Sequence, residues 1–405
     1  MTLAPERPGA APPGRTPAIY LVTAAGVPNY GDELILRCWL DRLAERLPDT
    51  EVFVDCIAPG TATRLHASRP AVRFVDHLWR TAWAAPSDDL GAGLQWLDDV
   101  TRRPDPVFPL RLADDALARC SAMVFVGGGY LAGHWARHAL LLALAARARK
   151  LHGIRLFASG LGLSPEAPQT ARRIASWFSE FDHVGVRDPE TFALLERVVP
   201  GLAELGPDEV WSIEPPAEQP DDGGPTLNVS INHDLLGTPE SIRHLQDGVA
   251  ELVTLFRHRV GSSGRIRWLE LLPGDGWLAR TLAGLIEPFE LVGFQDLWRT
   301  GLGIAPASLC VGSRFHFHLL AAASGACGHA LVANEFYRTK HASIVAATGW
   351  STSSFADFQP AALLERWLER AAPGDPSLAE RRRELCEDAR RRLDHLTRLL
   401  RAGGG

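Results

Sequence analysis

The residue types best suited to chemistry are basic side chains and an imidazole that stand where short apolar runs end. Arg187 directly follows the run 183–186, and Ser313-Arg314-Phe315-His316 follows the run 308–311. Lys340 comes shortly after the next apolar run along the chain. Guanidinium and ammonium groups bind carboxylates and phosphates, and an imidazole beside a bound anion can act as a general acid. This set predicts a site for a small anionic ligand.

Lysine is rare in this chain, which gives Lys340 added weight. Lys150 and Lys340 are the two lysines among 42 Lys and Arg residues. A lysine kept against this bias suggests a role for a compact ammonium group that a planar guanidinium cannot fill. The alternative for Lys340 is an ordinary surface charge.

Three consecutive glycines, Gly127-Gly128-Gly129, follow the apolar run 123–126. Residues without side chains let the backbone approach a ligand or turn sharply, and both interpretations stay open. Two interpretations also stay open for Arg187: its guanidinium can bind a ligand anion or pair with the adjacent Asp188. The glycines do not form the dinucleotide-binding pattern G-x-G-x-x-G, and no phosphate-binding loop G-x-x-x-x-G-K-[ST] occurs.

No metal site is expected. His316 and His318 stand two residues apart and point in different directions on a helix, so joint ligation is not favoured. His134 and His138 have the helical i,i+4 spacing, but the glutamate of H-E-x-x-H and a third ligand are missing, so we expect helix-surface residues. Neither a D-x-D metal motif nor the hydrolase motif G-x-S-x-G is present.

Composition excludes several classes of protein. Of 405 residues, 46% are hydrophobic, which is enough for two cores, and the net charge of −6 argues against general nucleic-acid binding. No run reaches about 18 apolar residues, and the stretch Met1–Pro17 lacks the layout of a signal peptide. The six cysteines form no C-x-x-C pair, so we expect reduced core residues in a cytoplasmic protein.

Strand-length apolar runs alternate with helical patterns in two successive series. Such alternation is typical of βαβ units around a parallel sheet. A segment rich in Pro, Gly and acidic residues separates the two series and is interpreted as a linker. We therefore expect an α/β fold of two doubly wound Rossmann-like domains facing a cleft, with C-terminal helices. The expected boundaries are a disordered lead 1–16, an N-terminal domain 17–213, a linker 214–225, a C-terminal domain 226–350 and a helical extension 351–405.

Local signals predict several helix ends. The first helix is expected over 33–47, with Asn29 or Asp32 capping its free amides. Gly153 is expected to be a left-handed C-cap, and Asp188-Pro189 to be an N-cap followed by the first helical residue.

Two regions differ from the alternating pattern. Region 81–112 is interpreted as an insertion with a short helix. Region 360–401 is expected to form amphipathic helices packed on the body, because apolar residues recur on one face and arginines interleaved with acids lie opposite. This pattern leaves peripheral membrane contact open.

The motifs together resemble those of the polysaccharide pyruvyl transferase family. They follow the order of that family over about residues 18–350 and are Gly26 to Glu33 (GVPNYGDE), Phe125 to Gly129 (FVGGG), Gly185 to Asp188 (GVRD), Ser313 to His316 (SRFH) and Tyr337 to Lys340 (YRTK). The resemblance implies two Rossmann-like domains of the GT-B type. It also implies transfer of the pyruvyl group of phosphoenolpyruvate to a sugar diol, with a cyclic ketal and phosphate as products and no cofactor or metal.

The resemblance implies roles for individual residues. Arg187, His316 and Lys340 would bind the donor and carry out catalysis, with His316 protonating the methylene carbon. Asp32 or Glu33 is our nominee for the base that activates a hydroxyl, with Asp208 in reserve. The remaining substrate-binding residues are expected to be Asn29, Gly127, Gly128, Gly129, Ser313 and Arg314.

Two other functions stay open. One is a GT-B-type nucleotide-sugar glycosyltransferase, and the other is a non-catalytic glycan-binding relative that kept the scaffold. The expected partners are phosphoenolpyruvate and a sugar or glycan acceptor, with no nucleic acid.

Overall fold

The computed structural model divides the chain into two compact units. It describes residues 18–67, 69–103, 107–131, 137–163, 168–213, 224–233, 237–369 and 376–402. Unit 1 comprises Met1–Val27, Ile35–Gly206 and Arg391–Gly405, and unit 2 comprises Pro28–Leu34 and Pro207–Arg390. The predicted lead 1–16 and most of the predicted linker lie outside the described residues.

Unit 1 contains a parallel sheet in the strand order β3-β2-β1-β4-β5-β6-β7. Its strands are β1 (Ala18–Val22), β2 (Val52–Asp55), β3 (Val72–Val75), β4 (Cys120–Val126), β5 (Arg155–Leu161), β6 (His183–Val186) and β7 (Ala203–Leu205). The chain crosses over after β3 and returns to pair β4 with β1, so the topological switch point of this sheet lies between β1 and β4.

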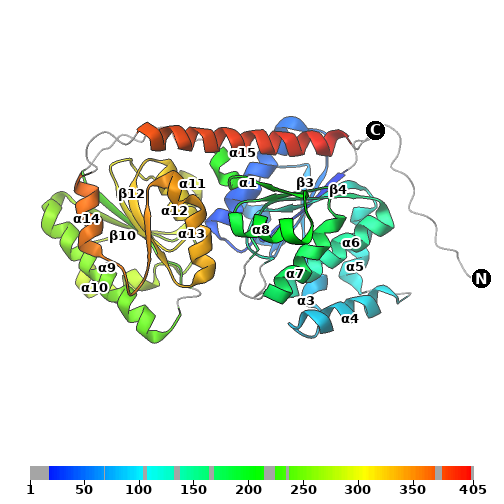
Figure 1. The fold of residues 1–405 in the computed structure, drawn as a ribbon, viewed down its shortest axis with the longest axis horizontal. Coiled ribbons are helices and arrows are strands. Elements are labelled where there is room, and N and C mark those ends of the chain that lie inside the picture. Colours follow the sequence, from blue (N-terminus) through cyan, green and yellow to red (C-terminus); the bar gives the residue numbers. More distant parts are fainter. Residues whose placement is uncertain are drawn as a thin grey trace, which may run out of the picture. The chain divides into compact units, whose positions relative to one another are not determined.

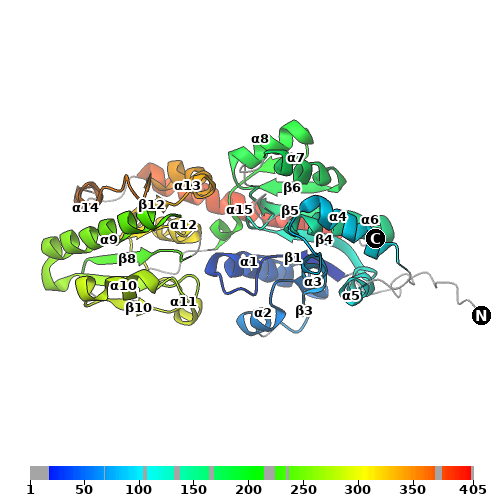
Figure 2. The ribbon, with the colours of Figure 1, turned by 90° about the horizontal axis from the view of Figure 1, so that it is seen from below.

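The helices of unit 1 cover both faces of this sheet (Figures 1 and 2). They are α1 (Tyr30–Arg46), α2 (Pro59–Leu65), α3 (His77–Trp83), α4 (Leu90–Thr101), α5 (Phe108–Leu117), α6 (Leu140–His152), α7 (Pro168–Trp177) and α8 (Pro189–Val198). The first turn of α1, up to Leu34, clusters with unit 2, and the rest of α1 belongs to unit 1.

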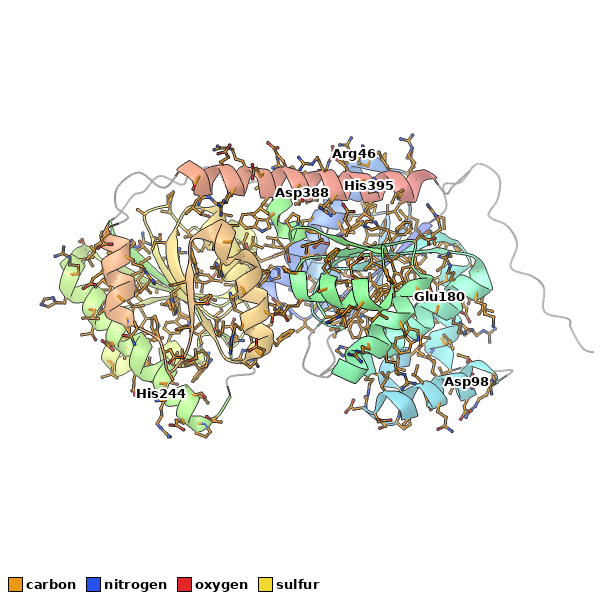
Figure 3. The ribbon with its side chains drawn as sticks, in the orientation of Figure 1. Arg46, Asp98, Glu180, His244, Asp388 and His395 are labelled. Atoms are coloured by element: carbon orange, nitrogen blue, oxygen red, sulfur yellow. The ribbon has the colours of Figure 1, made fainter. Side chains whose placement is uncertain are left out.

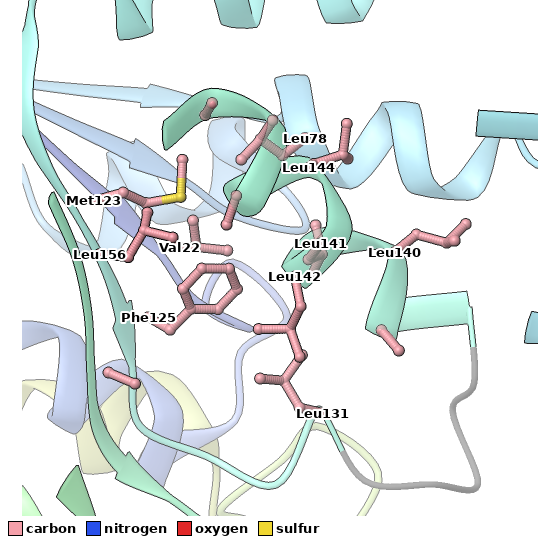
Figure 4. Packing of buried hydrophobic residues seen from close by; sticks show 14 of the residues in the cluster. Val22, Leu78, Met123, Phe125, Leu131, Leu140, Leu141, Leu142, Leu144 and Leu156 are labelled. Carbon is pink, nitrogen blue, oxygen red and sulfur yellow. The ribbon is translucent and has the colours of Figure 1, made fainter. Parts of the chain in front are cut away.

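The core of unit 1 forms where the apolar central strands meet the helices. Strands β1 and β4 are almost continuous apolar runs, which is typical of parallel strands buried on both faces. Figure 4 shows Val22 of β1 with Met123 and Phe125 of β4, packed against Leu141 and Leu144 of α6. All five side chains are fully buried.

Unit 2 repeats the arrangement with a parallel sheet in the order β10-β9-β8-β11-β12-β13. Its strands are β8 (Thr226–Ser230), β9 (Arg265–Leu269), β10 (Glu290–Val292), β11 (Leu309–Gly312), β12 (Cys327–Val332) and β13 (Ser351–Ser354). Here the switch point lies between β8 and β11.

The helices of unit 2 also cover both faces of its sheet (Figure 2). They are the short 3-10 helix η3 (Glu209–Ser212) and the α-helices α9 (Pro239–Val260), α10 (Trp277–Ile286), α11 (Phe294–Thr300), α12 (Phe315–Ala323), α13 (Glu335–Thr348), α14 (Pro360–Glu369) and the first part of α15 (Pro376–Ala402). Exposed polar side chains such as Asp98, Glu180 and His244 project from helices of the two units (Figure 3).

The predicted caps at Gly153 and Asp188 are confirmed, whereas α1 begins at Tyr30, three residues before the predicted start, so Asp32 lies inside the helix and is not its cap. Gly153 has φ +69 and ends α6, and its amide donates to the carbonyl of Arg149. Asp188 caps α8 by accepting from the amide of Thr191, and Pro189 is the first helical residue. Asn29 accepts from the amide of Gly31 at 3.3 Å, so it contributes to the start of α1.

The region 81–112 corrects the sequence prediction. Instead of a single short helix, it spans the end of α3, all of α4 and the start of α5. Helix α5 packs against α3, so these residues form an additional helical layer. The sequence analysis also missed β13, because its residues Ser351–Ser354 are polar and small and lack the apolar pattern of a buried strand.

Helix α15 has the predicted amphipathic character. Within unit 1 its residues Leu393, Leu396 and Leu400 are buried. Arg46, labelled in Figure 3, places Nε 3.1 Å from Asp394 Oδ1. Arg155 donates to the carbonyls of the last turn of α15, which satisfies acceptors that a helix end leaves open.

Two further predictions concern the whole chain. All six cysteines are free thiols; five are buried, as predicted for core residues, and Cys386 is half-buried instead. Within the described ranges, no helix combines the length and apolar character that crossing a membrane requires.

Candidate active site

Buried polar side chains meet at the carboxyl ends of β8 and β11, the switch point of the sheet of unit 2. Ser313, directly after β11, donates from Oγ to Asn232 Oδ1 at 2.7 Å and accepts from Asn232 N at 2.9 Å. Asn232 Nδ2 in turn donates to the Tyr337 hydroxyl at 3.0 Å. All three residues are buried. These bonds fix the loops after β8 and β11 and the first turn of α13 to one another.

Arg314 holds a buried carboxylate at the same edge. Its Nε and Nη2 donate to the two oxygens of Asp275 at 2.9 and 2.6 Å, a bidentate pair. Asp275 also accepts from the amide of Leu272 at 2.9 Å, and its Oδ1 lies 3.1 Å from Nδ1 of His233. Arg314 was predicted to bind substrate, and in unit 2 its charge is balanced by Asp275.

His316 stands in the first turn of α12. Its Nε2 is buried, has no hydrogen-bond partner among the described residues and lies 3.5 Å from Oδ2 of Asp208. Asp208 is itself buried and caps η3 by accepting from the amide of Val210. Asp208, the reserve base of the sequence analysis, therefore lies at ion-pair distance from the predicted general acid.

The first turn of α1 lies directly against His316. A Cβ atom added to Gly31 would stand 1.7 Å from Nδ1 of His316, so this position has no room for a side chain. The segment is anchored by Tyr30, whose amide donates to the carbonyl of Leu271 at 2.8 Å. The Tyr30 ring packs edge-on against Trp298 at 5.9 Å. A steric requirement thus explains the glycine of the N-Y-G-D motif.

A chain of hydrogen bonds through two histidines and a threonine supports the loop that carries Ser313. Nε2 of His341 lies 3.3 Å from the carbonyl oxygen of Ser313, Nδ1 of His341 lies 3.0 Å from Nδ1 of His318, and Nε2 of His318 lies 2.9 Å from the hydroxyl of Thr348. A carbonyl only accepts, so His341 carries its proton on Nε2 and accepts at Nδ1 from His318. Thr348 then donates to His318.

This chain of bonds requires both imidazoles to be neutral. Burial lowers the pKa of His341 to about 4 and lowers that of His318 well below its ordinary value. His318, which the sequence placed beside His316, therefore packs within the fold: its ring stacks on Trp350 at 4.4 Å.

Lys340 lies on α13 and is half-buried. Its Nζ is 3.8 Å from the ring centre of Phe336 and 5.7 Å from that of Tyr337, which are cation–π distances. Because the Tyr337 hydroxyl bonds to Asn232, Lys340 is connected through its ring partner to the Ser313 loop.

The predicted site residues of unit 1, Arg187 and the three glycines, are buried within that unit. Arg187 follows β6, is buried and lies beside Gly162, where a Cβ would stand 3.5 Å from Nε. Gly127 and Gly128 have positive φ values of 57 and 79, and a Cβ on Gly127 would meet Ile35 at 2.6 Å. The Gly127-Gly128-Gly129 run is buried, and backbone conformation and the lack of space at Gly127 favour glycine at its first two positions.

The nominated bases differ in exposure. Glu33 is fully buried in the first turn of α1, whereas Asp32 beside it is half-buried. Both residues lie in the segment Pro28–Leu34 that clusters with unit 2.

His134 and His138 were predicted to lie on a helix surface. His134 lies outside the described residues. His138 is not a helix-surface residue: its Nδ1 lies 2.8 Å from the carbonyl oxygen of Tyr130 and its ring packs edge-on against Trp79 at 4.8 Å. Across the residues that can be placed, no group of three or more His, Cys, Asp and Glu side chains is arranged to hold a metal ion.

Sequence reasoning missed His233 and Asp275. Asn232 and His233 follow the run that forms β8, and Asp275 lies between two glycines after β9. Polar residues directly after predicted strands were a usable signal, but only the tertiary structure brings Asp275 to Arg314, 39 residues away.

A family model described as polysaccharide pyruvyl transferase matches residues 29–332. Among curated protein sequences, none matches the chain.

Solved structures show what fold the chain shares. UGT89C1 of Arabidopsis thaliana, solved with quercetin, is 12% identical with a TM-score of 0.57, over 95% of this chain and 100% of that one. MnaA of S. aureus, solved with UDP, is 11% identical with a TM-score of 0.57, over 95% and 97%. The glycotransferase of kitacinnamycin is 13% identical with a TM-score of 0.53, over 96% and 99%. The predicted fold class, two Rossmann-like α/β domains of the GT-B type, is confirmed.

The packing of Gly31 on His316 gives a first prediction. Gly31→Ala forces the imidazole from its position and destabilises the protein by roughly 1–3 kcal/mol, the usual cost of overpacking. Carbethoxylation of individual histidines, read by mass spectrometry, should then show faster modification of His316. Gly284→Ala is the control, since a Cβ there meets nothing within 4 Å. Equal modification of His316 in both variants would contradict this packing.

The neutral histidines give a second prediction. His341 has an ordinary pKa of 6.5 and a folded-state pKa of about 4, so the unfolded chain takes up its proton first as the pH falls. Its contribution to the free energy of unfolding, about 3 kcal/mol, is complete above pH 6.5 and is lost as the pH falls from 6.5 to 4. Urea unfolding at four pH values should show that the free energy of unfolding depends less steeply on pH in His341→Gln than in wild type. The exposed-surface variant His244→Gln should keep the wild-type slope, and a wild-type slope in His341→Gln would refute the neutral pair.

Proposed function

We infer the reaction from one premise: the chain belongs to the polysaccharide pyruvyl transferase family. It is therefore a transferase that acts on a sugar or glycan acceptor. We propose that its donor is phosphoenolpyruvate and that it forms a cyclic pyruvate ketal on a sugar diol with release of phosphate. The family match carries this proposal. A cytoplasmic location belongs to the same proposal, because the donor is a cytoplasmic metabolite.

The donor sets the charge that the site must balance. Phosphoenolpyruvate carries a carboxylate and a phosphate of about −1.5 to −2 near neutral pH. Lys340 is a proposed partner of these anions, and Arg187 keeps the donor-binding role that its family motif implies. Arg314 is already bidentate to Asp275, so in this proposal it orients the loop more than it supplies charge.

His316 is the proposed general acid. It transfers a proton to C3 of phosphoenolpyruvate, which leaves a cationic centre at C2. One acceptor hydroxyl forms a C–O bond to C2 and gives up its proton. The second hydroxyl then forms the other C–O bond to C2 and gives its proton to the departing phosphate, whose C–O bond breaks as the ketal ring closes. Asp208, at 3.5 Å from Nε2, supports the ring of His316 during proton transfer.

The burial of the nominated bases favours one of them. Glu33 is 0% exposed, so a sugar hydroxyl cannot reach it without opening the first turn of α1. Asp32 keeps partial exposure, so of these two nominees it is the one that a hydroxyl can reach.

No cofactor or metal enters this proposal. Its charge compensation and proton transfers use side chains of the chain alone. The glycosyltransferase alternative predicts instead that a nucleotide sugar is consumed while phosphoenolpyruvate releases no phosphate. The non-catalytic alternative predicts glycan binding without turnover.

The third prediction tests this reaction. The purified protein, given phosphoenolpyruvate and a panel of glycosides with free diols, should release phosphate with at least one acceptor. His316→Gln should lower the rate by about 10²- to 10⁴-fold, the usual contribution of a general acid. His244→Gln, on the exposed face of α9, should behave like wild type.

Lysine substitution provides a matched pair in the same assay. Lys340→Met should raise the KM for phosphoenolpyruvate, whereas Lys150→Met, which changes the other lysine of the chain, should not. Lys340→Arg should recover little if a compact ammonium group is required. If wild type and the His316 and Lys340 variants release phosphate equally, the assignment of these residues is wrong.

A further inference from the structure

We propose that His233 is a further catalytic residue of this site: it accepts the proton of an acceptor hydroxyl as that hydroxyl attacks C2 of the donor. This inference rests on the proposed function and deepens it, because it assigns the second proton transfer to an imidazole. It takes the place of Asp32 as the base for the attacking hydroxyl.

The first observation is the orientation of the imidazole. Nδ1 of His233 lies 3.1 Å from Oδ1 of Asp275, a carboxylate that is 0% exposed. Arg314 donates two hydrogen bonds to Asp275 and the amide of Leu272 donates another, so both carboxylate oxygens already accept from donors. A carboxylate bound in this way accepts a hydrogen bond, so Nδ1 of His233 carries the proton. Nε2 is then the basic nitrogen.

A buried carboxylate that fixes the tautomer of a histidine base is a recurring arrangement in enzymes. It selects which nitrogen is free to take a proton and holds the ring in one orientation. The imidazolium formed during the reaction also faces a negative charge, which stabilises it. Arg314 holds Asp275 in place by donating two hydrogen bonds to its carboxylate.

The second observation is accessibility. The His233 side chain is 37% exposed, while its carboxylate partner is fully buried. No hydrogen bond from Nε2 of His233 occurs among the residues that the structure describes. Gly274, with φ +105, lies against the ring, and a Cβ there would stand 3.3 Å from Cε1. The glycine leaves space for the ring beside the loop.

The structural histidines of unit 2 look different. His318 and His341 are fully buried and use both ring nitrogens in hydrogen bonds. His329 also uses both nitrogens, with Ser351 and Ser353. His233 has one nitrogen bound to a buried carboxylate and an exposed ring, which is the pattern of a base and not of a packing residue.

The third observation is position. His233 follows Asn232, whose amide and side chain bond to Ser313, and Asp275 bonds to Arg314. The imidazole therefore lies on the loop edge that also leads into α12 and His316. In doubly wound sheets, ligands bind beyond the carboxyl ends of the strands at the switch point, which in unit 2 is this edge. His316 and His233 would then serve as acid and base for one reaction.

The test compares His233→Gln with wild type at saturating phosphoenolpyruvate. We expect kcat to fall by about 10²- to 10⁴-fold, the range for a general base, with phosphoenolpyruvate affinity unchanged in equilibrium binding. His233→Ala should be partly rescued by added imidazole, a result that a packing role does not produce. His244→Gln is the matched control on an exposed helix face and should keep wild-type kcat.

Further variants separate this base from its alternatives. Asp275→Asn should lower kcat. Thermal melting of this variant shows whether the fold survives loss of the ion pair with Arg314. If the variant does not fold, His233→Gln still tests the role of His233. Asp32→Asn should reduce kcat less than His233→Gln. A wild-type kcat in His233→Gln, or no imidazole rescue of an inactive but folded His233→Ala, overturns the role of His233.

The outcome also separates this inference from the proposed function. If wild type releases no phosphate from phosphoenolpyruvate with any acceptor, the proposed reaction fails and the role of His233 in it fails as well. If wild type is active and His233→Gln is equally active, only the role of His233 fails.

Discussion

The bidentate pair of Arg314 with Asp275 is the interaction on which the site in unit 2 depends. It joins the loop after β9 to the loop after β11, and Asp275 extends it to the loop after β8 through His233. Removing one partner of such a buried pair commonly costs roughly 3–5 kcal/mol, because the other charge stays buried without compensation. The pair therefore fixes the geometry of the loop edge, and it explains why Arg314, which the sequence predicted to bind substrate, is turned toward the protein.

Environment separates the histidines of unit 2 into two kinds. His318 and His341 are held neutral by burial and transmit hydrogen bonds from Thr348 to the backbone of Ser313. His316 and His233 each face a buried carboxylate instead, Asp208 and Asp275 respectively. The neutral pair stabilises the loop without adding charge, and the two carboxylate-facing imidazoles supply the groups that can move protons.

The first turn of α1 shows how a sequence motif can have a steric origin. Gly31 is a glycine because the His316 ring occupies the space of a side chain. Tyr30 fastens the turn to unit 2 through the carbonyl of Leu271 and the ring of Trp298. The acidic residues Asp32 and Glu33 are thereby placed in the turn that contacts the proposed general acid, although most of α1 belongs to unit 1.

The sequence alone determined the two α/β units, the caps at Gly153 and Asp188 and the family, because apolar periodicity, capping residues and ordered motifs are local properties of the chain. It also placed Ser313 and His316 at a strand end, since strand and helix patterns adjoin there. It did not reveal β13, whose small polar residues carry no strand pattern. Only the tertiary structure decided that Asp275 meets both Arg314 and His233, the latter 42 residues away. Contacts of this kind depend on the order of strands in a sheet, and that order is set by packing over the whole unit.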